Sequence, residues 1–277
     1  MLAHQLYGDI GLREFGDLDL LVQFSDLGRV TDILLRMGYR RQDPLEGKRA
    51  GASRRSTIHE VFIPDRASPA VEIHWDILPR YYSIPLDLRS LWKRRSSFLI
   101  AGRKMPCFAP EDLFLILCLH AWKHQYERLV WLVDLAMMAE RNSGFDWGRL
   151  AEQAGRWRIQ RIWSLSFSLL KELLDVRSVC KADAPSSSPP LRRAASYVRE
   201  RALHRAEGEK PPKREEVPYC LLTRECWRDR LHYLLRLVWV WVTPTRHEWS
   251  SIPLTDRFFF LYYLVRPIRL AGRYLSR

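Results

Sequence analysis

The amino-acid sequence predicts an α+β fold, with a small mixed β-sheet followed by a mostly helical C-terminal region. Strand-like apolar runs bounded by turn residues occupy 18–23, 57–64 and 70–77. After Pro79, apolar residues recur mainly at helical spacing. The 277 residues and 47% hydrophobic content allow one large or two modest cores and exclude a wholly disordered chain.

The first strand carries a pair of carboxylates. In 13–22 (REFGDLDLLV), Asp17 and Asp19 stand two positions apart, so the alternation of a strand places both on one face. Their mutual repulsion is relieved by a divalent cation such as Mg²⁺, which prefers oxygen ligands. For an isolated pair, a solvated Gly-Asp-x-Asp turn that caps backbone amides is the simpler interpretation.

The third strand supplies further polar groups and favours the metal interpretation. The polar side chains of 70–77 (AVEIHWDI) share one face: Glu72, His74 and Asp76. Glu72 can therefore lie beside the aspartates of the first strand. His74 can hydrogen-bond a metal-bound carboxylate or carry a proton near neutral pH, although a strand-end histidine bonded to a backbone carbonyl is an equally good explanation.

Residues that typically begin or end helices and loops predict the remaining N-terminal elements. Residues 2–7 predict a short helix, and a second helix is expected from a cap at Ser25 to Met37, ended by Gly38. The polar, basic stretch 40–55 predicts a flexible loop, whose arginines either close over a triphosphate or stay in water. The two later strand runs predict an antiparallel hairpin in one sheet with 18–23.

Helices 110–124 and 127–141 carry an unusual set of polar residues at helical spacing: His120, Lys123, His124, Arg128 and Asp134. Such groups are costly within apolar helices unless they are paired or line a cleft. Lys123 and Arg128 are therefore candidate phosphate ligands. The competing explanation is a buried ion pair between Asp134 and a Lys or Arg.

The other expected elements complete the helical region. A strand pair is expected near 98–100 and 104–107, and the further helices at 146–155, 161–174, 192–207, 223–241 and 255–275. Exposed linkers are expected at 181–190 and 208–218. We expect a core domain over 1–108 and a helical domain over 109–277.

Three segments together carry a resemblance to a known family. LYGDIGLREFGDLDLLV at 6–22, DLGRVTDILLRMGYR at 26–40 and VEIHWDI at 71–77 resemble the uncharacterised bacterial nucleotidyltransferase family, a distant branch of the DNA polymerase β-type nucleotidyltransferase superfamily. The segments 110–136 and 258–270 resemble that family's helical region. The resemblance thus covers most of the chain.

The resemblance implies roles for individual residues. It makes Asp17 and Asp19 metal ligands and Glu72 the third carboxylate of a catalytic site for Mg²⁺ or Mn²⁺. The ions would activate an acceptor hydroxyl and neutralise charge on a nucleoside triphosphate, such as ATP. It also implies a phosphate contact for Arg13, for which a surface ion pair with Glu14 or Asp9 is the alternative.

The implied reaction transfers NMP from an NTP to a small-molecule acceptor. Transfer to RNA or to a protein side chain is an alternative, and so is a catalytically impaired accessory or scaffold protein. Superfamily members carry a Gly-Ser or Gly-Gly phosphate-binding turn upstream of the aspartates, whereas here only sixteen residues precede Asp17 and show no such turn. A misassigned start codon and a loss of triphosphate binding both explain this difference.

Composition limits the partners and the compartment. The net charge of +13 favours an anionic partner, although the arginines are scattered along the chain rather than clustered. The five cysteines show neither zinc-site nor disulfide spacing, which fits a reducing cytoplasm. No apolar run is long enough for a transmembrane helix. The short apolar, aromatic runs 237–243 and 258–265 predict buried helices, with peripheral membrane contact as the alternative.

Overall fold

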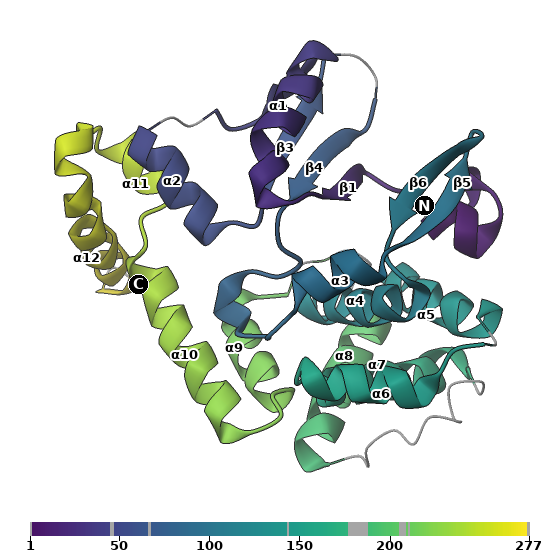
Figure 1. The fold of residues 1–277 in the computed structure, drawn as a ribbon. Coiled ribbons are helices and arrows are strands. Elements are labelled where there is room, and N and C mark those ends of the chain that lie inside the picture. The colour runs from purple at the N-terminus through teal and green to yellow at the C-terminus, as the bar shows by residue number, and fades with distance from the viewer. Residues whose placement is uncertain are drawn as a thin grey trace. The chain divides into compact units, whose positions relative to one another are not determined.

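The computed structural model describes residues 2–44, 47–65, 68–142, 144–176, 188–204, 209 and 211–275. The chain forms two compact units, each built from two separate segments. The helical unit comprises Met1–Arg13 and Ile84–Arg230, and the sheet unit comprises Glu14–Ser83 and Leu231–Arg277. A small mixed sheet followed by a mostly helical region confirms the predicted α+β class (Figure 1).

The sheet unit contains a four-stranded mixed sheet with the order β1-β4-β3-β2. Its strands are β1 (Asp17–Leu21), β2 (Tyr39–Arg41), β3 (His59–Pro64) and β4 (Ala70–His74). β1 runs parallel to β4, whereas β3 is antiparallel to both β4 and β2. The predicted hairpin of the second and third strand runs is therefore confirmed, and the acidic strand β1 lies directly beside it.

One face of this sheet is buried beneath α1 (Leu27–Arg36), as Figure 1 shows. The side chains of this core come from the helix and from the central strands: Leu27, Leu34, Phe62, Val71 and Ile73. The predicted cap at Ser25 is wrong, because Ser25 lies inside the 3₁₀ turn η3 (Phe24–Asp26) and α1 begins only afterwards. Gly38 does end the helical segment, with a φ of 86° that few other residues adopt.

The predicted loop 40–55 is also wrong, because most of it forms β2 and α2 (Gly47–Ser56). This segment contains two glycines and is a weak helix former by itself. Its Ala52 is 1% exposed and packs in a cluster with Trp249, Phe259 and Tyr262 from the end of the chain. Tertiary contacts thus stabilise a helix that local sequence does not predict.

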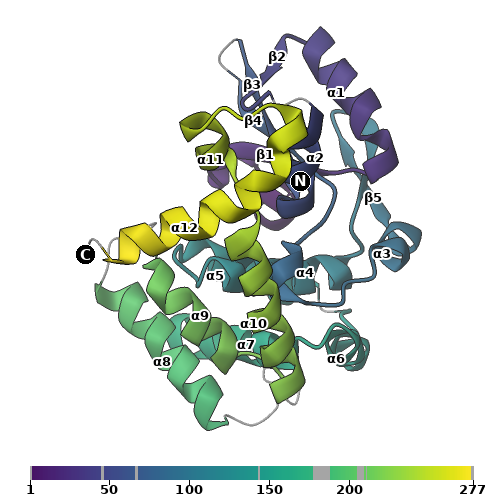
Figure 2. The same ribbon diagram turned by 90° about the vertical axis from the view of Figure 1, so that its left-hand side faces the viewer.

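The C-terminal elements that cover α2 are α11 (Arg246–Ser251), η6 (Asp256–Leu261) and α12 (Tyr262–Leu275), as Figure 2 shows. Two arginines of α2 are engaged inside the same unit. Arg49 donates to the carbonyl oxygen of Leu254 over 2.9 Å, and Arg54 donates to Glu60 over 2.9 Å. These contacts fix α2 against its neighbours.

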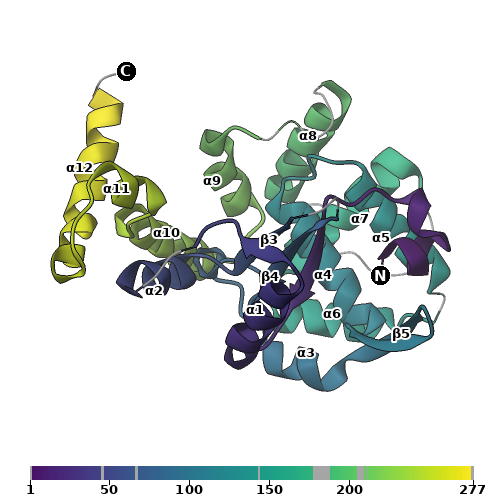
Figure 3. The ribbon, with the colours of Figure 1, turned by 90° about the horizontal axis from the view of Figure 1, so that it is seen from above.

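The helical unit is built around α4 (Pro110–Lys123), whose Phe114, Cys118 and Trp122 are fully buried. Figure 3 shows its other helices: α3 (Leu88–Arg94), α5 (Val130–Arg141), α6 (Trp147–Arg156), α7 (Gln160–Leu174), α8 (Pro189–His204) and α9 (Lys213–Leu222). Two short helices, η1 (Ala3–Tyr7) and η2 (Ile10–Leu12), and the hairpin of β5 (Ser96–Ile100) and β6 (Arg103–Cys107) complete it. The predicted N-terminal helix, strand pair and helices through 174 are confirmed, with shifted ends.

The structure describes only part of the first predicted linker and shows a helix in part of the second. Positions 181–187 of the first lie outside the described residues, and its end is wrong because Pro189 and Pro190 belong to α8. The linker predicted at 208–218 is wrong from residue 213 onward, because α9 begins there. The helix continues through Pro218. Tyr219 and Cys220 are buried, and the indole nitrogen of Trp122 donates to Thr223 over 2.9 Å at the end of α9. This packing outweighs the backbone hydrogen bond that the proline removes.

The chain passes from the helical unit into the sheet unit within α10 (Trp227–Val242). The predicted helices 223–241 and 255–275 correspond to α10 and to η6 with α12. Among the helices that the structure describes, none is both long and apolar enough to cross a membrane.

A fully buried carboxylate links the C-terminal helices of the sheet unit. Glu248 accepts hydrogen bonds from the backbone nitrogen and hydroxyl of Thr245, at 2.8 and 2.7 Å, in a capping box. Arg266 lies 3.3 Å away, and Arg269 donates through Nε over 2.8 Å. Burial alone would raise the pKa of Glu248, but these hydrogen bonds and charges lower it to about 2.

Replacement of Glu248 with glutamine should destabilise the sheet unit by about 3 kcal/mol at neutral pH, because a buried ion pair loses one partner. Since the pKa is depressed in the folded state, this stability is present above pH 4.5 and decreases by about 1.4 kcal/mol per unit as pH falls toward 2. Urea unfolding at pH 7, 5 and 3.5 measures both effects.

The matched control is Glu152→Gln, which removes a solvent-exposed pair with Arg156 and should cost less than about 0.5 kcal/mol at every pH. An equal, pH-independent loss in both variants would contradict the assignment of Glu248.

Candidate functional site

The face of the sheet opposite α1 gathers the polar side chains of three strands. In the register of the sheet, Asp19 lies opposite Glu72, and His74 lies opposite His59. Asp17 precedes Asp19 by two positions and therefore points to the same side. The pleat brings five ionisable groups to one face, although they come from three separate strands and from positions that range from 17 to 74.

His74 is the centre of this face. Its Nε2 lies 2.8 Å from Oδ1 of Asp19 and 3.2 Å from Oε2 of Glu72. The Nε2 of His59 lies 3.8 Å from the same Glu72 oxygen, and the two imidazole rings are 4.9 Å apart. The structure thus places His74 between two of the predicted carboxylate ligands.

The charges on this face shift one another's pKa values. Burial alone would lower the pKa of His74, but its hydrogen bonds to Asp19 and Glu72 raise it to about 8. The same contact with His74 lowers the pKa of Glu72. The pKa of Asp17 is raised by partial burial and by the negative charges of Asp19 and Glu72. His74 therefore carries a proton at neutral pH and balances part of the carboxylate charge.

The other predicted ligands, Arg13, Lys123 and Arg128, belong to the helical unit. Arg13 donates through Nε and Nη2 to both oxygens of Asp134, over 2.8 to 3.0 Å, and the Asp134 side chain is 1% exposed. The hydroxyl of Tyr7 donates to the same carboxylate over 2.8 Å. The buried ion pair expected at Asp134 is thus present, but its cation comes from the N-terminal segment.

A small aromatic cluster joins α4 to α5, and Lys123 and Arg128 are close to its members in the sequence. The imidazole rings of His120 and His124 lie 5.0 and 5.1 Å from the ring of Trp131. Lys123 is half-buried and Arg128 is exposed. Two of the five polar residues singled out from the sequence are therefore packed against an aromatic side chain of this unit.

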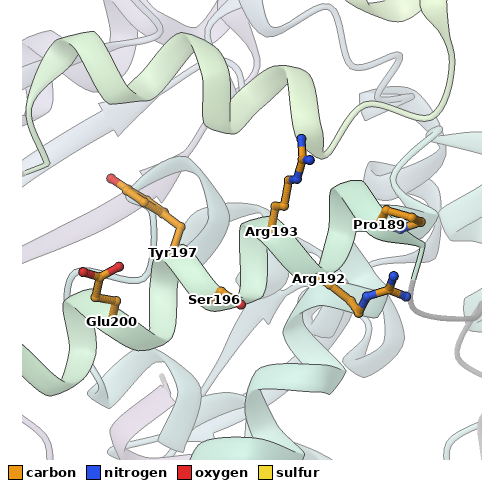
Figure 4. Close-up of a pocket in the computed structure, with 6 residues that line it drawn as sticks. All are labelled: Pro189, Arg192, Arg193, Ser196, Tyr197 and Glu200. Carbon is orange, nitrogen blue, oxygen red and sulfur yellow. The ribbon is translucent and has the colours of Figure 1, made fainter.

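A surface hollow on α8 is a separate feature of the helical unit, shown in Figure 4. It is lined by Pro189, Arg192, Arg193, Ser196, Tyr197 and Glu200. None of the site residues predicted from the sequence is among these.

His59 is the residue of the acidic face that sequence reasoning does not select. It begins β3 and follows a segment that resembles a loop in sequence. Only the hairpin register, which pairs His59 with His74, reveals its position. The alternation of 57–64 would have indicated the face of His59 once this register was known.

Comparison with known proteins identifies a family. Residues 1–175 match the family model described as uncharacterised nucleotidyltransferase. This region includes the entire four-stranded sheet and all of the site residues predicted above. No curated protein matches the chain, and no solved structure matches it.

Replacement of Asp134 with alanine should lower the free energy of unfolding by about 3 kcal/mol, because it removes the buried carboxylate shared by Arg13 and Tyr7. Arg128→Ala, at an exposed position, should change it by less than about 0.5 kcal/mol. Urea denaturation of both variants checks this, and equal stability of Asp134→Ala and the unaltered protein would contradict an anchoring role.

Proposed function

The chain belongs to the uncharacterised nucleotidyltransferase family, and from this premise we propose that it transfers NMP from an NTP to a small-molecule acceptor. The observation that carries the proposal is the gathering of Asp17, Asp19 and Glu72 on one open face of the sheet. Three carboxylates on adjacent strands have the composition of a site for Mg²⁺ or Mn²⁺.

The residues present fit such a cation. Asp17 and Asp19 project from one strand, and Glu72 lies opposite Asp19 on the next. The raised pKa of Asp17 reflects burial and repulsion by the other two carboxylates, and this repulsion is relieved by a positive countercharge. When bound, the cation would supply charge neutralisation on the triphosphate and a lowered pKa of the acceptor hydroxyl.

The protein's own residues orient this set. His74 holds a proton at Nε2 and donates toward Asp19 and Glu72, so it fixes the two carboxylates relative to each other. It comes from β4, whose register with β1 is held by backbone hydrogen bonds. We therefore assign His74 a positioning role rather than direct contact with phosphate.

The proposal also includes residues that bind the phosphates of the nucleotide. Lys123 and Arg128 are the predicted phosphate ligands, and ATP is one candidate donor nucleotide. Arg13 is already held by a buried carboxylate, which supports a structural role for it and leaves less of its guanidinium for an anion. The proposed acceptor is a small molecule, with transfer to RNA or to a protein side chain as the alternative.

The proposal predicts Mg²⁺-dependent binding of at least one NTP, measured by calorimetry with each of the four NTPs. Asp17→Asn and Asp19→Asn should reduce pyrophosphate release by about 100-fold or more, because each removes a cation ligand. Asp32→Asn, an exposed position on α1, should leave release unchanged. Absence of Mg²⁺-dependent binding for all four NTPs would overturn the proposal.

A further inference from the structure

Part of the acidic face forms a second set of potential ligands that contains nitrogen. The set consists of His59, Glu72 and His74, and one donor atom from each lies within 4.8 Å of the others. The Glu72 oxygen is 3.2 Å from Nε2 of His74 and 3.8 Å from Nε2 of His59. This is the only such group of three among the described residues.

These separations suit a single small cation. A tetrahedral Zn²⁺ ion with bonds of about 2.0–2.1 Å places its ligand atoms about 3.3 Å apart. The two distances to the Glu72 oxygen, 3.2 and 3.8 Å, lie close to that value. The donor atoms of the two imidazoles lie within 4.8 Å of each other. Side-chain rotation and release of the Nε2 proton of His74 would therefore bring all three atoms to one ion.

The three side chains stand on a rigid support. His59 and His74 form a cross-strand pair between β3 and β4, and Glu72 lies two positions before His74 on the same face. The exposed fraction of the side chain is 37% for His59, 23% for Glu72 and 17% for His74. They are shielded enough to be ordered and open enough to admit an ion. Sites built on paired strands hold their geometry better than sites on loops.

The donor chemistry separates this set from the all-oxygen set of Asp17 and Asp19. Imidazole nitrogen suits Zn²⁺ and related transition metals, whereas Mg²⁺ takes oxygen ligands and demands near-octahedral geometry. Two imidazoles and one carboxylate leave a fourth position open, which is the pattern of Zn²⁺ sites that admit water or a ligand. Oδ1 of Asp19 lies 2.8 Å from Nε2 of His74 and is a further oxygen close to this set.

We propose that His59, Glu72 and His74 bind one divalent transition-metal ion of the Zn²⁺ class. The site does not require Asp17 and does not depend on nucleotidyl transfer. Glu72 belongs to both sets, so a transition metal and Mg²⁺ compete for this carboxylate or share it.

The test is a titration of the full-length, metal-stripped protein with Co²⁺, whose visible absorption reports coordination, followed by displacement with Zn²⁺. One equivalent of Co²⁺ should bind, and Zn²⁺ should displace it. His59→Gln should weaken Co²⁺ affinity by more than about 10-fold, because a direct ligand is lost. Asp17→Asn should weaken it by less than about 3-fold, because the Asp17 side chain is outside the set.

The control His232→Gln, at an exposed histidine of α10, should bind Co²⁺ as the unaltered protein does. The proposal is overturned if His59→Gln keeps full affinity, or if Asp17→Asn loses as much as His59→Gln. X-ray absorption of the Zn²⁺-loaded unaltered protein reports the ligands of the ion directly and needs no variant. Two imidazoles per Zn²⁺ support the site, and a shell of oxygen alone overturns it.

Discussion

The parallel pairing of β1 with β4 is the constraint on which the candidate site depends. It places Asp19 beside Glu72 and keeps Asp17 on the same face. A shift of β1 by one residue in this register would turn Asp17 and Asp19 toward the apolar core beneath α1, where their desolvation would be costly. Val71 and Ile73 of β4 are buried in this core, which keeps Glu72 and His74 on the opposite face of the sheet.

The concentration of negative charge on this face is partly offset by histidine. His74 shares its proton with Asp19 and Glu72, and His59 lies close to the same glutamate. This arrangement keeps adjacent carboxylates together in the absence of a cation. It also creates the mixed nitrogen and oxygen environment from which a transition-metal site is inferred, next to the oxygen ligands expected of a nucleotidyltransferase.

Each unit also has its own buried carboxylate. Asp134 joins the N-terminal segment to α5 through Arg13, and Glu248 joins α11 to α12 through two arginines. In both cases residues far apart in the sequence meet at one charge. Such pairs are costly to break because the remaining charge loses its partner, so they favour one arrangement of the segments within each unit.

The elements that the sequence predicts correctly are those whose local pattern has one interpretation. The strand runs, the helix 110–124 and the shared face of Glu72 and His74 all follow from the periodicity of apolar residues. The sequence does not predict α2 or the start of α9, because those helices depend on burial against distant segments. The contacts of Ala52 with Trp249, Phe259 and Tyr262 cannot be inferred from either segment alone.

The sequence by itself determined the fold class, the family resemblance and the acidic face, since alternation along a strand decides where neighbouring side chains point. Only the tertiary structure decided that Arg13 pairs with Asp134 and that His59 lies beside His74. Those two contacts join residues 121 and 15 positions apart. Their formation depends on strand register and packing, which are properties of the folded chain as a whole.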